Sequence, residues 1–86
     1  MTHSIKIEPS ARKYLSSLDV GIRRRIMQAI DKLSTTPRPS GCKKLRERDA
    51  YRIRIGDYRV IYEVHDDVLV ILVIRVAHRS DVYDRL

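Results

Sequence analysis

Three arginines near the middle of the chain have the spacing of a phosphate-binding surface. Arg52, Arg54 and Arg59 flank the dipeptide Gly56-Asp57. A two-residue Gly-Asp loop between runs of β-branched and aromatic residues predicts a tight β-hairpin. Because side chains alternate along a strand, this loop puts the three guanidinium groups on one face and pairs Arg54 with Arg59. Guanidinium groups bind phosphate oxygens through forked hydrogen bonds, so the hairpin is a candidate phosphate clamp.

A solvated strand face is the alternative for this cluster. A solvated face normally mixes both signs of charge, and like charges directly opposed across a ladder are unfavourable. The surrounding sequence favours the clamp, because residues 43–59 hold seven Lys or Arg against three Asp or Glu in a chain of net charge +7. A small basic domain points first to nucleic acid or to an acidic protein partner, although charge also serves solubility alone.

Three further residues with useful chemistry follow the last predicted strand. His78 can titrate near neutrality, and Tyr83 can donate, accept or stack on a base. Together with Arg79 and the hairpin arginines they suit RNA self-cleavage, in which the 2′-hydroxyl attacks the adjacent phosphorus. That reaction needs a base, cations for the phosphorane charge and an acid. The alternatives are a packing or capping role for His78 and closure of the core by Tyr83.

Other chemistries lack their sequence signals. The three histidines and the lone Cys42 form no pair at metal-ligand spacing, and the glycine-rich phosphate loops are absent. Nothing locates a Ser/His/Asp triad. The single cysteine excludes a disulfide framework and fits a reducing, cytoplasmic setting. No apolar run approaches the ~18 residues that span a bilayer, and no signal peptide is expected.

The elements that must position these residues follow from periodicity. His3 to Ile7 alternates as a short edge strand, and Pro9 suits the first turn of a helix of two to three turns. Asp19 is a good N-cap for a second helix, which should end near Thr35 because Pro37 follows. Its apolar stripe, and that of the first helix, predict the core-facing residues Ala11, Tyr14, Leu15, Leu18, Ile22, Ile26, Ala29, Ile30 and Leu33.

The second half of the chain predicts strands. After the loop at 37–41 and the hairpin, residues 63–65 extend the second hairpin strand, and Asp66-Asp67 turn it. The run from Val68 to Val76 is apolar apart from Arg75, which predicts a central strand. Residues 77–83 should leave the sheet, and residues 84–86 should add a short turn.

These elements predict one domain over residues 1–86. We expect an α+β fold of order β-α-α-β-β-β. A four-stranded antiparallel sheet carries an αα-hairpin on one face, and the other face stays open with Arg52, Arg54 and Arg59.

The sequence resembles the RelE/ParE superfamily of bacterial toxins from type II toxin–antitoxin pairs, and is most similar to the RelE branch. The resemblance covers nearly the whole chain. It is carried by Lys43-Lys44-Leu45, by the hairpin Tyr51 to Tyr62, and by Val76 to Tyr83. Two departures are visible: Leu45 lacks the usual following Gly, and only three residues separate Arg79 from Tyr83.

The resemblance implies a metal-independent endoribonuclease that needs no cofactor, cleaves mRNA in the ribosomal A site and inhibits translation. It implies the ribosome, mRNA and a cognate antitoxin as partners, with a hetero-oligomer and no membrane. Position by position, it implies that Arg59 contacts the scissile phosphate, Arg79 is a second catalytic arginine, and Tyr83 stacks on or activates the nucleotide. His78 is a further candidate for proton transfer, and the expected RNA-binding residues are Lys43, Lys44, Arg52 and Arg54.

Two other functions stay open at the level of sequence. A ParE-like toxin that poisons DNA gyrase shares the fold, although it needs no such set of catalytic residues. A nucleic-acid-binding module without catalysis would use the same basic face.

Overall fold

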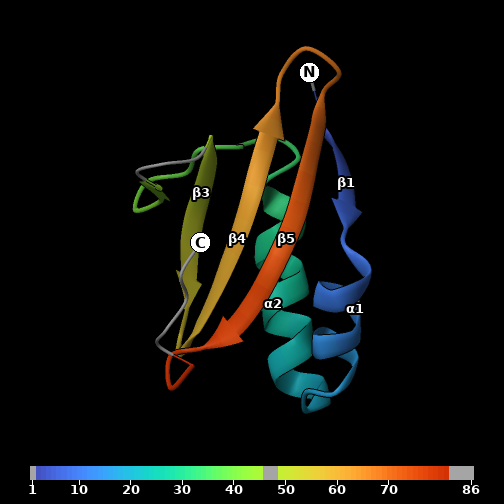
Figure 1. Ribbon diagram of the computed structural model, residues 1–86, viewed down its shortest axis with the longest axis vertical. Coiled ribbons are helices and arrows are strands. Elements are labelled where there is room, and N and C mark those ends of the chain that lie inside the picture. Colours follow the sequence, from blue (N-terminus) through green and yellow to red (C-terminus); the bar gives the residue numbers. More distant parts are fainter. Residues whose placement is uncertain (1, 46–48, 82–86) are drawn as a thin grey trace.

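The computed structural model of the chain describes residues 2–45 and 49–81. Within these ranges two helices lie behind one face of a five-stranded sheet (Figure 1). The strands are β1 (Ser4–Ile7), β2 (Lys43–Lys44), β3 (Ala50–Ile55), β4 (Tyr58–His65) and β5 (Val70–His78), and the helices are α1 (Pro9–Ser16) and α2 (Val20–Lys32). The α+β class and the order of the longer elements are confirmed.

The predicted four-stranded antiparallel sheet is wrong in two respects. The strand order is β1-β5-β4-β3-β2, and β1 pairs parallel to β5, so the sheet is mixed. Parallel neighbours need a long connection, which the chain between β1 and β5 supplies. β2 is an additional strand of two residues. It is too short to show an alternating pattern of apolar and polar residues in the sequence.

The hairpin is confirmed, with the register predicted for it. Arg54 lies opposite Arg59, Ile53 opposite Val60, and the loop is the pair Gly56 and Asp57. Gly56 has φ +59°, a backbone conformation that glycine adopts without steric cost. The turn therefore fixes which side chains of β3 and β4 share a face.

The boundaries predicted for the last strand are wrong at both ends. β5 begins at Val70, because Val68 is exposed and Leu69 takes a left-handed φ of 55° in the preceding turn. It continues to His78, so Ala77 and His78 belong to the sheet rather than leaving it. Its predicted central place is confirmed, between β1 and β4. The turn predicted for residues 84–86 lies outside the described residues.

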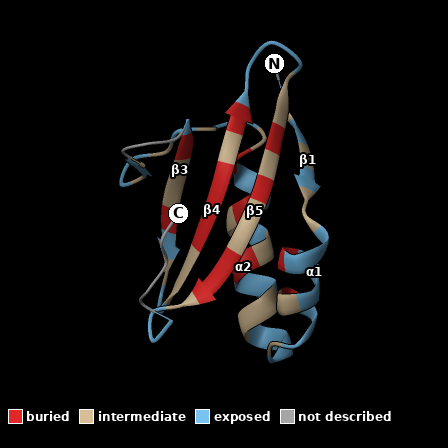
Figure 2. Ribbon diagram, in the orientation of Figure 1, coloured by how far each residue is buried: buried red, intermediate tan, exposed pale blue. Residues whose placement is uncertain are grey.

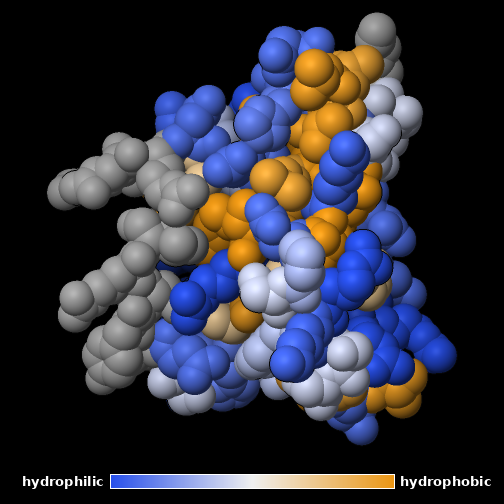
Figure 3. All heavy atoms as spheres, turned by 45° about the vertical axis from the view of Figure 1, so that its right-hand side comes forward, coloured by the Kyte–Doolittle hydropathy of each residue, from blue (hydrophilic) through white to orange (hydrophobic). Residues whose placement is uncertain are grey.

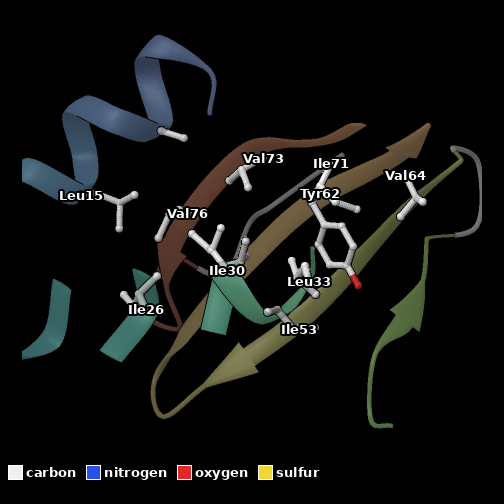
Figure 4. Close-up of a cluster of buried hydrophobic side chains, with 12 residues drawn as sticks. Leu15, Ile26, Ile30, Leu33, Ile53, Tyr62, Val64, Ile71, Val73 and Val76 are labelled. Atoms are coloured by element: carbon white, nitrogen blue, oxygen red, sulfur yellow. The ribbon is translucent and has the colours of Figure 1, made fainter. Parts of the chain in front are cut away.

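The core lies between the helices and the sheet. Buried residues recur along β3, β4 and β5 and on both helices (Figure 2). α2 contributes Ile26, Ile30 and Leu33. Ile30 and Leu33 lie toward Ile53 and Tyr62 of the sheet, and Ile26 lies beside Val76 (Figure 4). The other predicted core residues of both helices are buried or packed against this cluster. The opposite face of the sheet carries no helix within the described ranges and is called the open face below.

Both helices begin as predicted. Pro9 occupies the first turn of α1, and the Asp19 carboxylate caps α2 by accepting a hydrogen bond from the Gly21 amide at 3.1 Å. α2 ends at Lys32, with turn backbone continuing toward Thr35. Neither helix is long and apolar enough to cross a bilayer, and the described residues contain no other candidate span.

Candidate nucleic-acid interface

Basic side chains from three neighbouring strands gather on the open face of the sheet. The β3–β4 register places Arg52, Arg54 and Arg59 there, as predicted, because they alternate with the core residues Ile53 and Val60. Pairing across the neighbouring ladders adds Lys43, opposite Arg52, and Arg75, opposite Ile61. We call this surface the basic face; its members are Lys43, Arg52, Arg54, Arg59 and Arg75.

The basic face consists of two rows that cross the strands. One row runs Lys43, Arg52, Ile61 and Arg75, and the adjacent row runs Arg54, Arg59 and Ala77. Lys44 does not join it, since Lys44 lies opposite Tyr51 on the other side of the pleat and pairs with Asp49 at 3.7 Å. The prediction of Lys44 as an RNA-binding residue therefore has less support from the fold than that of Lys43.

Apolar residues separate the charges. Ile61 lies between Arg52 and Arg75 and is only 3% exposed, and Ala77, opposite Arg59, is also 3% exposed. The Nε of Arg52 is buried and has no hydrogen-bond partner in the part of the chain that the structure describes. Charges beside buried apolar surface interact more strongly than charges in open water, which suits this face to holding an anion.

Arg79 is tied to the tip of the hairpin. Its backbone amide donates to the Asp57 carbonyl at 2.6 Å, and its Nε lies 3.9 Å from Asp57 Oδ1. Its side chain is largely exposed. The turn at Gly56 and Asp57 thus positions Arg79 at the same end of the sheet as Arg54 and Arg59, two residues after Ala77.

His78 lies on the opposite side of the sheet from Arg59. It pairs with Tyr58, and the two rings meet edge to face with centroids 5.0 Å apart. Its Nδ1 accepts a hydrogen bond from the Ser80 amide at 3.0 Å and lies 2.8 Å from the Ser80 hydroxyl. Because an amide only donates, Nδ1 is the acceptor and the proton of the neutral ring sits on Nε2. In this arrangement His78 offers a donor.

The remaining predicted site residue, Tyr83, lies outside the described residues. Arg75 was missed as a site residue because simple alternation assigns it to the same face as Val73, in the core. A register shift in the β4–β5 ladder at Ile61 and Tyr62 reverses that assignment. The lone arginine in an apolar strand was the available signal.

The surface beside the basic face includes apolar residues of β5, next to Lys6 of β1. Val70 and Leu72 of β5 are half-buried and lie on the open face, opposite His65 and Glu63. Figure 3 shows a hydrophobic band (orange) in the upper part of the molecule, with hydrophilic surface (blue) around and below it. The open face therefore combines cationic and apolar surface. In the described ranges no three His, Cys, Asp or Glu side chains gather as metal ligands.

Comparisons with known proteins agree with the motifs. A family model described as the ParE toxin of the type II toxin–antitoxin system matches residues 5–83. A putative RelE-like toxin protein of Escherichia coli is 30% identical, over 98% of this chain and 93% of its own. Toxin RelG of Mycobacterium tuberculosis is 32% identical, over 99% of this chain and 100% of its own.

Solved structures show the same fold. RelE in the archaeal RelE–RelB complex of Pyrococcus horikoshii superimposes with a TM-score of 0.83 at 36% identity, covering 92% of this chain and 97% of that one. The isolated RelE toxin of E. coli gives a TM-score of 0.79 at 27% identity, covering 94% and 90%.

Proposed function

Since this chain belongs to the ParE toxin family of type II toxin–antitoxin systems, within the RelE/ParE superfamily, we propose that it is a RelE-like endoribonuclease. It acts in the cytoplasm, cleaves mRNA in the ribosomal A site and thereby inhibits translation. The supporting observation is the basic face, on which Arg54 and Arg59 lie directly opposite each other beside the turn that holds Arg79. Relatives and solved neighbours named RelE favour this branch.

In the proposed reaction the 2′-hydroxyl loses its proton to a base and attacks the adjacent phosphorus. The bond from phosphorus to the 5′-oxygen breaks, an acid protonates that oxygen, and a 2′,3′-cyclic phosphate and a 5′-hydroxyl result. Arg59 contacts the scissile phosphate, and its guanidinium offsets the charge of the phosphorane. Arg79 contributes from the hairpin tip as a second phosphate ligand or as the acid. Lys43, Arg52 and Arg54 hold the RNA backbone on the basic face, whereas Lys44 lies on the other side of β2 and is left out of this set. No step is assigned to a metal or cofactor.

Proton transfer is the demanding part of this chemistry. Arginine has a pKa above about 12 and tyrosine about 10, so neither exchanges protons readily at neutral pH. We propose that Tyr83 stacks on or activates the nucleotide. His78 is a weaker candidate for proton transfer, because it lies on the other side of the sheet from Arg59 and its neutral ring offers at Nε2 only a very weakly acidic N–H. Cleavage should therefore be slow on free RNA and fast only where the ribosome orients the substrate.

The test is mapping of mRNA ends on programmed ribosomes with purified toxin. Arg59→Ala and Tyr83→Ala should each slow cleavage by about 100-fold or more, the usual cost of removing a group that stabilises transition-state charge. Arg24→Ala removes an exposed arginine from α2, away from the sheet face, and should cut normally. Full activity in both site variants contradicts the residue assignment.

The wild-type toxin, tested both in purified form and by expression in cells, separates the two alternative functions. DNA breaks and cell filamentation without mRNA cuts would identify a ParE-like gyrase poison. Binding to RNA or ribosomes without any cut would identify a nucleic-acid-binding module.

We also propose a cognate antitoxin as partner, because several solved neighbours are RelE–RelB toxin–antitoxin complexes. An acidic or amphipathic antitoxin segment suits an open face that joins cationic to apolar surface. Co-expression with the protein encoded by the adjacent reading frame should give a stable hetero-oligomer and restore growth. A neighbouring product that neither binds nor rescues growth contradicts the assignment.

A further inference from the structure

Arg75 reaches the open face through an irregularity in the sheet. In the β4–β5 ladder Tyr62 pairs with Val73 but Ile61 pairs with Arg75, so Ile74 is an extra residue on β5. Regular alternation would have pointed Arg75 to the same side as Val73, which is fully buried. After the irregularity Val76 enters the core and Arg75 faces outward. β-bulges often re-aim a side chain beside an active site.

The position of Arg75 extends the basic face in one direction. Arg75 is two strands away from Arg52 in the same row, and neighbouring strands lie about 4.8 Å apart. The two Cα atoms are thus roughly 10 Å apart. The adjacent row holds Arg54 and Arg59, so Arg75 continues the line of positive charge from the proposed scissile phosphate toward the edge of β5.

A cavity lies at that edge. β1 pairs with β5 only as far as Val73, and beyond it α1 passes beside the strand. The cavity has a volume of about 230 Å³, and its lining includes Arg75, Ser10, Tyr14 and Asp81. Its hydroxyl groups and carboxylate can bond with a ribose or with the edge of a base. The carboxylate disfavours a phosphate inside, whereas Arg75 at the border favours one just outside.

Asp81 and Arg75 both act electrostatically on Tyr14 in the cavity. Burial raises the pKa of Tyr14 above its usual value, the negative charge of Asp81 raises it further, and the positive charge of Arg75 opposes both. Arg75 therefore influences the cavity at the same time as it belongs to the basic face.

We propose that Arg75 binds an mRNA backbone phosphate next to the scissile one, and that the adjacent cavity receives the ribose or base of that nucleotide. This inference rests on the proposed function, because it names a second subsite for the same RNA. The occupant is a single-stranded polyribonucleotide, held by one phosphate contact and read by the hydroxyl and carboxylate groups of Ser10, Tyr14 and Asp81.

The experiment measures binding of a single-stranded oligoribonucleotide over a range of salt concentrations. A 2′-deoxy nucleotide at the cleavage position keeps the probe intact. Arg75→Gln and Arg75→Met should weaken binding and reduce the slope of log K against log salt by about 0.7, the value for one phosphate contact on a single strand. Arg75→Lys should restore the slope. Arg24→Gln makes the same charge change on α2 and should keep the wild-type slope.

Urea unfolding of each variant separates a folding defect from a binding defect, and Arg75→Met keeps the aliphatic stem for packing. On programmed ribosomes, folded Arg75 variants should raise KM more than they lower kcat. A wild-type salt slope in folded Arg75→Gln and Arg75→Met overturns the inference, even if the wild-type toxin cleaves mRNA. If the salt slope of binding depends on Arg75 but the wild-type protein never cleaves mRNA, the phosphate subsite is supported and the proposed function is overturned.

Discussion

Arg54 and Arg59 lie directly opposite each other on the β3–β4 ladder, one residue pair away from the turn at Gly56 and Asp57. Directly opposed like charges destabilise a sheet. The turn fixes this register, and a slip by one residue would move the buried Ile53 and Val60 to the open face. The fold therefore forces two guanidinium groups together, which concentrates positive charge where an RNA phosphate is proposed to bind.

Replacing Arg54 should improve stability and impair function. Arg54→Thr removes the repulsion and keeps a good strand former, so the free energy of unfolding should rise by about 0.2–1 kcal/mol. RNA affinity should fall in the same variant. Urea unfolding and the oligoribonucleotide titration measure the two effects, and Arg54→Lys, which keeps the charge, should gain no stability. A less stable Arg54→Thr variant would show that the pair is not repulsive in the folded chain.

The stability gained by Arg54→Thr should depend on salt concentration. At 1 M ionic strength the Debye length is about 3 Å, so opposed charges at the surface are screened. The stability difference between wild type and Arg54→Thr should shrink as salt rises from low concentration to 1 M. Unfolding curves at both concentrations check this, and a difference that does not change with salt would point to packing rather than charge.

Two glycines should respond oppositely to alanine. Gly56 has φ +59°, and a Cβ there would meet its nearest atom, Arg25 Nη2, at an ordinary 3.6 Å, so Gly56→Ala costs only backbone strain of about 1 kcal/mol. Gly21 lies in the first part of α2, where alanine is the better helix former, and Gly21→Ala should stabilise by about 0.5–1 kcal/mol. Urea unfolding of both variants is the measurement. Equal shifts of the same sign would refute the assigned turn geometry.

The hairpin could be predicted from sequence because its register depends on local features. A two-residue Gly-Asp loop and alternating apolar residues leave one pairing that buries Ile53 and Val60. The core-facing stripes of the two helices could also be predicted, because each depends on the spacing of residues within one helix. The parallel place of β1 beside β5 depends on long-range packing, which no periodicity records.

The irregularity between Ile61 and Tyr62 could not be predicted, because β5 is apolar on both faces around it. Either alternation of such a strand satisfies the hydrophobic pattern, so the side on which Arg75 emerges was undetermined. His78 was expected near the arginines because it follows the predicted central strand, but its register with Tyr58 puts it on the other face.

Asp66 should contribute to acid sensitivity. Hydrogen bonds from Arg38 Nη2 at 3.0 Å and from the His3 ring at 3.0 Å lower the pKa of this carboxyl below its usual value, with Arg38 the larger cause. The unfolded chain therefore binds this proton first as pH falls. Stability from the pair is present above the usual carboxyl pKa of about 3.9 and is lost as pH falls through the lower native value.

Asp66→Asn should accordingly lower stability at neutral pH and flatten the acid limb of a stability–pH curve. Arg38→Gln should do the same, and the double variant should lose less than the two single losses combined, because both remove one interaction. Thermal or urea unfolding between pH 2 and pH 7 provides the curves. Fully additive losses would show that the two side chains do not act through their contact.

Tyr62 should be a main cause of the loss of stability at alkaline pH. Its side chain is fully buried, its hydroxyl donates to the Pro37 carbonyl at 2.7 Å, and burial is the main cause that raises its pKa above the usual value of about 10. The phenol ionises first in the unfolded chain as pH rises, so stability falls above about pH 10 at about 1.4 kcal/mol per pH unit for one proton.

Tyr62→Phe should cost about 1–2 kcal/mol at neutral pH, because it deletes the hydrogen bond to Pro37. Above pH 10 the free energy of unfolding of the variant should also fall less steeply with pH than that of wild type. The difference in slope should be about 1.4 kcal/mol per pH unit, the value for one proton. Some slope should remain, since the pKa of Tyr14 is raised as well. Urea unfolding from pH 8 to pH 11 measures both effects, and equal alkaline slopes in wild type and variant would show that Tyr62 ionises alike in the folded and unfolded chain.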